Sequence, residues 1–176
     1  MVDLASLVVD VPDFPRPGVV FKDVTPLLAS AAGLAAAVDG LVASAPTGVD
    51  VVVGMEARGF LFGPPVALAL GVGFVPVRKP GKLPRERIEV SYALEYGEET
   101  LALHADAVRP GDRVLVVDDV LATGGTAVAA AGLVRRLGAE VVGVSVLLEL
   151  TALPGRALLA EHGLYQVSAV LTSGAP

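Results

Sequence analysis

Apolar residues gather along this chain in short runs rich in valine, separated by stretches that contain glycine, proline or charged residues. Such runs are typical of parallel strands that are buried on both faces. The predicted strands are residues 49–53, 73–77, 113–117 and 141–148. Pro76 lies in the second run and indicates a strand end or an edge strand, because proline donates no backbone hydrogen bond.

Segments rich in alanine and leucine lie between these runs and predict helices over residues 30–45, 60–70 and 126–137. The last has Arg135 and Arg136 in its final turn and Gly138 directly after it, which is typical of a helix C-terminus. Strands that alternate with helices predict an α/β fold, with one domain over residues 1–176 and a mostly parallel central sheet flanked by helices.

Three segments do not follow this alternation. Residues 91–104 contain two short strand-like runs around Gly97, which predicts a hairpin. The first 28 residues have four prolines between residues 11 and 26 and no clean period, so we expect an irregular cap there. Residues 153–176 have no pattern that assigns a structure.

Composition excludes several classes of protein. The 176 residues are 53% apolar, which suits one compact domain, and the net charge of −6 is unlike that of a general nucleic-acid binder. The absence of cysteine excludes disulfides, thiolate zinc sites and a cysteine nucleophile. The two histidines, His104 and His162, are too far apart in sequence to suggest a histidine metal cluster.

Targeting signals are also missing from the sequence. The N-terminus has no basic region, and the uncharged stretch 59–77 contains three prolines, which would break a lipid-facing helix. We therefore expect a cytoplasmic protein without a membrane partner. The high apolar fraction of so small a chain also indicates a buried subunit interface.

The candidate chemistry is concentrated in residues 114–126, where a buried run leads to two carboxylates, a loop with two glycines, and a helix. Ligands of open α/β sheets bind beyond the carboxyl ends of strands, and glycine amides at a helix N-terminus favour an anion. The segment therefore predicts a phosphate site at Ala122, Thr123, Gly124, Gly125 and Thr126, which we call the phosphate loop.

The two carboxylates, Asp118 and Asp119, would repel that phosphate and are better suited to sugar hydroxyls or a divalent cation. Phosphate, diol and cation together outline a ribose 5-phosphate. The alternative is that the aspartates cap a helix and the glycines only make a tight turn. Neither a Walker loop nor the dinucleotide glycine motif matches this segment.

Two further segments are suited to anions. Arg58 follows the run 51–53, and its planar guanidinium suits phosphate oxygens; the alternative is that it pairs only with Glu56. Residues 78–87 hold five basic side chains and one acidic, a net charge of +4. This predicts a mobile arm that binds a compact polyanion such as pyrophosphate, the alternative being a solvated loop. Without interleaved aromatic residues, it does not suggest nucleic acid.

Residues 114–126 resemble the phosphoribosyl-diphosphate motif of type I phosphoribosyltransferases. Four more stretches, 14–23, 58–63, 78–84 and 91–97, resemble the adenine-specific members in order and spacing, and the likeness weakens only after about Leu150. The resemblance implies transfer of the 5-phosphoribosyl group from 5-phospho-α-D-ribose 1-diphosphate to N9 of adenine, giving AMP and pyrophosphate. It also implies a homodimer and Mg²⁺ bound mainly through the substrate, near Asp118 and Asp119.

The same resemblance assigns roles to individual residues. The phosphate loop is expected to hold the 5-phosphate, and the two aspartates the ribose diol. Three basic residues are expected to hold pyrophosphate: Arg58, which also takes part in catalysis, Lys79 and Lys82. The family usually has a cis peptide that falls here between Glu56 and Ala57.

Residues 78–103 correspond to the family's flexible hood. Within it, Glu95 is the expected acid/base catalyst beside the purine, and Tyr96 packs over the ribose. From sequence alone, a glutamate near a turn is usually solvated, so this role depends on the resemblance. His104 is expected to approach the neighbouring subunit's site, the alternative being a structural histidine.

The purine pocket is expected within residues 1–28, which we call the cap. Main-chain groups of Val20 and Lys22 would recognise adenine, and Phe21 would pack against its face; some relatives have arginine in place of Lys22. A 6-oxopurine reverses adenine's donor and acceptor and would leave buried groups unpaired. The alternatives are a phosphoribosyltransferase for hypoxanthine, xanthine or orotate, a non-catalytic sensor of phosphoribosyl diphosphate, and a diphosphokinase.

Overall fold

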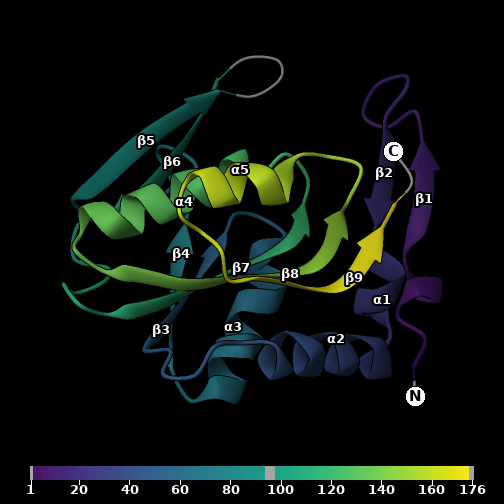
Figure 1. The fold of residues 1–176 in the computed structure, drawn as a ribbon, viewed down its shortest axis with the longest axis horizontal. Helices are drawn as coiled ribbons and strands as arrows, with labels where there is room; N and C mark the ends of the chain where they lie inside the picture. Colours follow the sequence, from purple (N-terminus) through teal and green to yellow (C-terminus); the bar gives the residue numbers. More distant parts are fainter. Residues whose placement is uncertain (1, 94–97, 175–176) are drawn as a thin grey trace.

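The computed structural model describes residues 2–93 and 98–174 and contains a central sheet of five parallel strands (Figure 1). The order in the sheet is β4, β3, β7, β8, β9. These strands are β3 (Val51–Met55), β4 (Gly73–Val77), β7 (Arg113–Leu121), β8 (Glu140–Leu150) and β9 (Val167–Ser173). The α/β prediction is confirmed, and β4 is an edge strand, as Pro76 indicates.

Helices cover both faces of the sheet. Helices α2 (Ala31–Ala43) and α3 (Gly59–Leu70) pack on one face, and α4 (Gly125–Arg136) and α5 (Gly155–Glu161) on the other (Figure 1). Each side has its own apolar core, with Phe62 and Leu41 at the centre of the first and Leu133 and Leu159 in the second. The valine-rich strands are buried on both faces because helices exclude water from both.

The N-terminal cap is regular, and only the prediction that it is irregular is wrong. After a 3₁₀ turn (Ala5–Leu7), β1 (Val9–Pro12) and β2 (Val20–Asp23) form an antiparallel ribbon, and α1 (Thr25–Ala29) follows. Cross-strand pairing supplies the backbone hydrogen bonds that local periodicity did not reveal. The ribbon lies beside β9 at one end of the sheet (Figure 1).

The predicted hairpin is confirmed in its two strands, β5 (Arg87–Ala93) and β6 (Glu98–His104), which pair antiparallel. Its turn lies outside the described residues. The hairpin packs against α4, where Arg136 Nη1 donates to the carbonyl of Glu89 at 2.6 Å. The hood is thereby held on the same face of the sheet as the phosphate loop.

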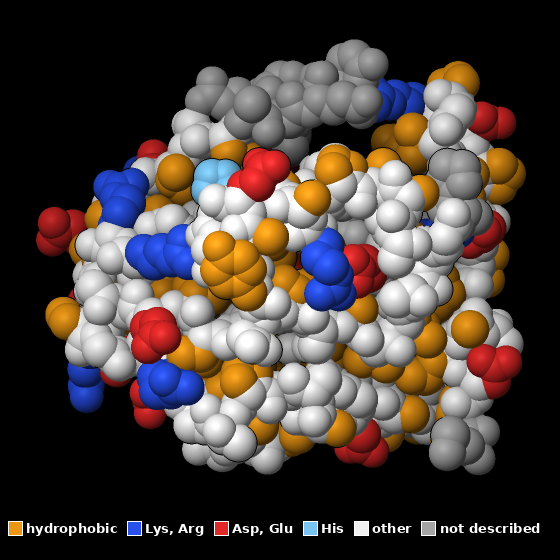
Figure 2. Space-filling model, viewed as in Figure 1, with side chains coloured by type: hydrophobic (Ala, Val, Ile, Leu, Met, Phe, Trp, Pro, Cys, Tyr) orange, Lys and Arg blue, Asp and Glu red, His pale blue; other side chains and the backbone are white. Residues whose placement is uncertain are grey.

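The surface and the hydropathy of the chain agree with a globular α/β domain. On the face viewed in Figure 2, acidic and basic side chains are interspersed among the described residues rather than gathered by sign. Within residues 2–93 and 98–174, no helix has the length and apolarity needed to cross a bilayer.

Candidate active site

The carboxyl ends of β3 and β7 open into a cavity of about 400 Å³, at the position where open α/β sheets bind ligands. Its lining brings together segments that are far apart in sequence: Glu56, Ala57, Arg58, Lys79, Tyr92, Glu99, Leu101, Asp118, Asp119, Val120, Ala122 and Thr126. A smaller cavity of about 70 Å³ lies along the phosphate loop and shares Asp118 and Thr126 with the first.

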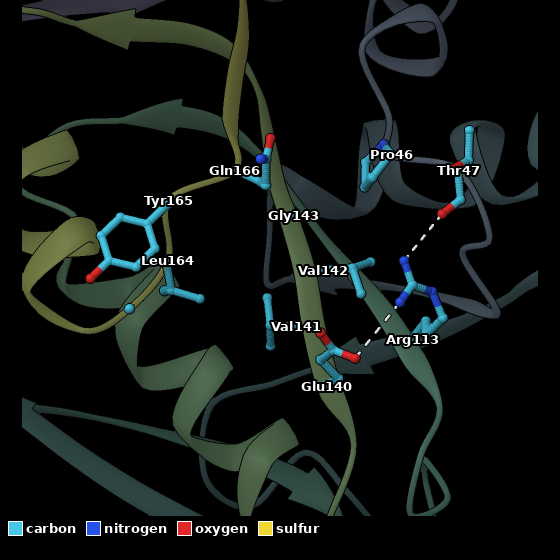
Figure 3. A pocket seen from close by; sticks show the side chains of 11 residues that line it. Pro46, Thr47, Arg113, Glu140, Val141, Val142, Gly143, Leu164, Tyr165 and Gln166 are labelled. Carbon is cyan, nitrogen blue, oxygen red and sulfur yellow. Dashed lines mark hydrogen bonds and ion pairs between the residues drawn. The ribbon is translucent and has the colours of Figure 1, made fainter.

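A larger cavity, of about 530 Å³, lies near the amino ends of β7 and β8 (Figure 3). Its charged side chains, Arg113 and Glu140, form an ion pair with 3.7 Å between Nη1 and Oε2. Arg113 also donates to the carbonyls of Thr47 and Gly48. Because these groups satisfy one another, the smaller cavities at the carboxyl ends are the better candidate site.

Asp118 and Asp119 lie within β7, which continues to Leu121, and not after the strand as predicted. Asp119 is buried, and its Oδ2 lies 2.7 Å from Nε of Arg58. This contact is an ion pair only, since Oδ2 accepts no hydrogen bond from any described residue. The alternative that Arg58 pairs only with Glu56 is therefore wrong.

Burial dominates the titration of these carboxyls. It raises the pKa of Asp118 well above its usual range, and the charge of Asp119 raises it further. Burial also raises the pKa of Asp119, which Arg58 partly opposes. Neither aspartate caps α4, whose first turn has no side-chain cap. Neighbouring carboxyl groups whose pKa values are shifted by burial beside a cavity are typical of a functional site.

The phosphate loop has a backbone that only glycine adopts easily at its centre. Gly124 is the N-cap of α4 and has φ +89°, and a Cβ there would lie 2.8 Å from the carbonyl oxygen of Gly155. A Cβ on Gly59, at the start of α3, would lie 2.8 Å from Oδ1 of Asp118. The N-terminus of α3 therefore approaches Asp118 closely, and the N-termini of both helices favour an anion.

The loop before α3 contains the expected cis peptide between Glu56 and Ala57. Glu56 Oε1 accepts from Nη2 of Arg78 at 3.1 Å, and Oε2 accepts from the main-chain N–H of Lys79 at 3.0 Å. Hydrogen bonds from Arg78, and then from Lys79, lower the pKa of Glu56. This ionised side chain joins the loop to the base of the hood.

Strands β5 and β6 contribute two residues that the sequence did not single out as site residues. Glu99 Oε1 lies 2.9 Å from Nζ of Lys79, and Tyr92 Oη donates to Glu99 Oε2 at 3.0 Å. The same hydroxyl lies 3.1 Å from Oγ1 of Thr126 in the phosphate loop. Lys79 lowers the pKa of Glu99, and burial raises that of Tyr92. Every second residue of a strand lies on the same face, and this alternation was the sequence signal that could have identified Tyr92 and Glu99.

The cap reaches the same site through Phe21, whose ring centre lies 4.8 Å from Cζ of Arg58. The side chain of Lys22 is buried elsewhere, against Asp10. Val20 is half-buried beside them. The structure thus brings Phe21 to Arg58 but directs the side chain of Lys22 elsewhere.

Other predicted site residues lie apart from the cavity or outside the described chain. Lys82 is exposed and Thr123 lines only the smaller cavity. His104 Nδ1 lies 3.4 Å from Arg85 Nη2, and its buried Nε2 has no hydrogen-bond partner among the described residues. Glu95 and Tyr96 lie outside the described residues, so their roles stay predictions.

Comparison with known proteins gives a consistent result. Residues 21–167 match the family model described as "Phosphoribosyl transferase domain". The chain is 64% identical over 169 residues to the adenine phosphoribosyltransferase of Cutibacterium acnes, with 96% of each chain covered. It superposes on the crystal structure of the enzyme from Thermoanaerobacter pseudethanolicus with a TM-score of 0.91 and 46% identity, covering 97% of this chain and 98% of that one.

A third comparison concerns a structure with ligands. The adenine phosphoribosyltransferase of Saccharomyces cerevisiae, complexed with adenine and D-2,5-dideoxy-2,5-imino-altritol 1,6-bisphosphate, superposes with a TM-score of 0.88 and 38% identity, covering 96% of this chain and 97% of that one.

The chain has a five-stranded parallel sheet in which one strand carries two aspartates and leads into a glycine loop. The phosphoribosyltransferase domain model matches most of the chain, and these features together define a phosphoribosyltransferase. Within that class, the chain belongs to the adenine phosphoribosyltransferase family, whose members are transferases.

Proposed function

We propose that this chain transfers the 5-phosphoribosyl group from 5-phospho-α-D-ribose 1-diphosphate to N9 of adenine, producing AMP and pyrophosphate in purine salvage. The observation that carries the proposal is the acidic pair, Asp118 and Asp119, placed between Arg58 and the phosphate loop in one cavity. The high identity to adenine phosphoribosyltransferases favours adenine over the other bases.

Substrate binding follows from the chemistry of the lining. The N-terminus of α4 and the amides of residues 122–126 suit the 5-phosphate. Asp118 and Asp119, beside that loop, suit the ribose 2- and 3-hydroxyls, because hydroxyl donors would stabilise carboxylates that burial disfavours. Asp119 also holds Arg58 toward the cavity.

Pyrophosphate leaves with a growing negative charge, which positive groups stabilise. Arg58 and Lys79 line the cavity and supply two such groups. Lys82 is exposed on the same arm, so it would reach pyrophosphate only by movement of residues 78–103, the hood. This movement is part of the proposal.

The donor set fits Mg²⁺ bound mainly by substrate. Among the described residues, no cluster of three or more acidic or histidine side chains is placed to hold a metal, and Asp119 Oδ2 already pairs with Arg58, so the substrate would have to supply most of the ligands. Two carboxylates suit an ion that retains water and binds phosphate oxygens. Asp118 and Asp119 would hold it, and when bound it would neutralise charge on the leaving pyrophosphate.

Base recognition and proton transfer are assigned to the cap and the hood. Main-chain groups of Val20 and Lys22 recognise adenine, and Phe21 packs on its face, near Arg58. Glu95 accepts the proton of N9 as that nitrogen attacks C1 of the ribose, and Tyr96 covers the sugar and excludes water.

A cytoplasmic homodimer completes the proposal. Helix α3 has no charged residue over its 12 positions, and Leu61 and Leu68 on it are 45% and 81% exposed. Burial of such a face against a second copy would remove apolar surface from water. His104 would then approach the neighbouring site.

The test is a direct assay of the purified protein with Mg²⁺ and 5-phospho-α-D-ribose 1-diphosphate, with AMP measured by chromatography. We expect AMP from adenine and at least ~10²-fold lower kcat/KM with hypoxanthine, because two buried groups would be left unpaired. No AMP, or equal efficiency with both bases, would contradict the proposal. Light scattering of the same sample gives the oligomeric state.

A further inference from the structure

A buried lysine lies on the strand to which base recognition is assigned. Lys22 is only 6% exposed, and its neighbour Phe21 lies against Arg58 at the active site. Successive side chains of a strand point to opposite faces, so the ammonium group of Lys22 lies behind the face that meets adenine. The main chain of Lys22 is assigned to adenine recognition, whereas its charged side chain lies on the opposite face of the strand.

The partner of this ammonium is Asp10. The two residues are directly opposite in the β1–β2 ribbon. Nζ of Lys22 lies 2.8 Å from Oδ1 and 2.9 Å from Oδ2 of Asp10, so both carboxylate oxygens are engaged. The pair borders a cavity of about 320 Å³ between the cap and the carboxyl ends of β8 and β9, lined mainly by the apolar or small residues Ala5, Val8, Leu148, Leu171, Thr172 and Ser173.

A buried ammonium without a counter-ion is strongly unfavourable, and the chain relieves this by moving. A shift of β2 toward water would expose the ammonium group, and it would carry the main chain of Val20 and Lys22 with it. The ion pair on the face of the ribbon that points away from adenine therefore influences where the base-recognising main chain of β2 lies.

We propose that Asp10 is a positioning residue for adenine: by neutralising Lys22, it fixes β2 and the base-recognising main chain against the ends of β8 and β9. The inference rests on the proposed function. It predicts a defect mainly in adenine binding, because the phosphate loop lies on other elements and Arg58 meets β2 only through the ring of Phe21.

The experiment compares four full-length variants with the wild type: Asp10→Asn, Asp10→Glu, the double variant Asp10→Asn with Lys22→Met, and Glu140→Gln. The last removes a carboxylate from an exposed ion pair at the amino ends of β7 and β8 and serves as the matched control. Initial rates give kcat and the KM for each substrate, and calorimetry gives Tm.

We expect Asp10→Asn to raise the KM for adenine about tenfold, while the KM for phosphoribosyl diphosphate changes less than about twofold, because only the counter-ion behind the base is lost. The double variant restores the KM for adenine to within about threefold of the wild type, because no unpaired charge remains. If Asp10→Asn does not fold, Asp10→Glu keeps the charge but displaces it, and must still raise the KM for adenine severalfold.

An unchanged KM for adenine in a folded, active Asp10 variant overturns the inference, as does an equal rise in both KM values. Failure of the proposed function is distinguishable, since the wild type would then produce no AMP from adenine.

Discussion

Replacement of Gly124 by alanine tests the phosphate loop most directly. This glycine combines a left-handed backbone, φ +89°, with a tight contact, because a Cβ would lie 2.8 Å from both the Gly155 oxygen and Leu159 Cδ1. The oxygen belongs to backbone and does not move away as a flexible side chain does. The substitution therefore strains the loop and displaces it from α5.

The magnitude follows from three contributions. An L-residue in this conformation costs about 1–2 kcal/mol, and overpacking adds about 1–3 kcal/mol. The smaller freedom of alanine in the unfolded chain offsets about 0.5–1 kcal/mol. A net loss of about 3 kcal/mol lies near the centre of that range and corresponds to a fall in Tm of roughly 6–12 °C for a domain of this size.

Two other glycines separate these contributions. Gly71, the C-cap of α3, has φ +72° with nothing within 4 Å of a Cβ, so Gly71→Ala measures the backbone penalty alone. Gly132 lies inside α4 with the same open space and no positive φ, so Gly132→Ala should stabilise by about 0.5–1 kcal/mol. Scanning calorimetry and the KM for phosphoribosyl diphosphate are measured for all three variants.

Only Gly124→Ala should raise that KM, by at least about tenfold, equivalent to ~1.4 kcal/mol. The reasoning is refuted if Gly124→Ala loses no more stability than Gly71→Ala, or if it binds phosphoribosyl diphosphate normally.

Three further substitutions address the charges of the site. Burial and the charge of Asp119 raise the pKa of Asp118, so the native protein loses stability as the pH rises above the ordinary pKa of an aspartate. The stability gained by Asp118→Asn in urea unfolding should therefore grow as the pH rises above about 4, while activity falls. A constant difference would contradict this. Glu99→Gln frees Lys79, and since exposed ion pairs contribute ~0.2–1 kcal/mol, it should lower the KM for phosphoribosyl diphosphate by at most about fivefold; a higher KM would show that Glu99 assists binding. Glu95→Gln should lower kcat by roughly 10²–10⁴ with little change in the dissociation constant for phosphoribosyl diphosphate, and unchanged turnover would exclude an acid/base role.

The sequence predicted the parts of the fold that local pattern controls. The valine-rich strands and the glycine after α4 have signals within a few residues, and the paired aspartates with their glycine loop identify the phosphate site. The acidic pair was predicted to follow the strand, whereas β7 includes both aspartates and ends at Leu121. The prediction failed because polar residues are usually taken as the end of a buried strand.

Long-range contacts could not be predicted in this way. The β1–β2 ribbon exists through pairing across a turn rich in proline, and β9 is formed by addition to the edge of β8. Glu56 and Glu99 look like ordinary surface acids until the fold places Arg78 and Lys79 beside them. Their partners lie about twenty residues away, beyond any pattern of a single element.

The contact between α5 and the phosphate loop has a consequence for engineering. A Cβ on Gly155 would collide with the carbonyl oxygen of Ala122, so the start of α5 packs directly against the phosphate loop and supports it. Libraries that randomise residues 151–156 as a dispensable surface turn, or shortened versions that stop at β8, would remove this support.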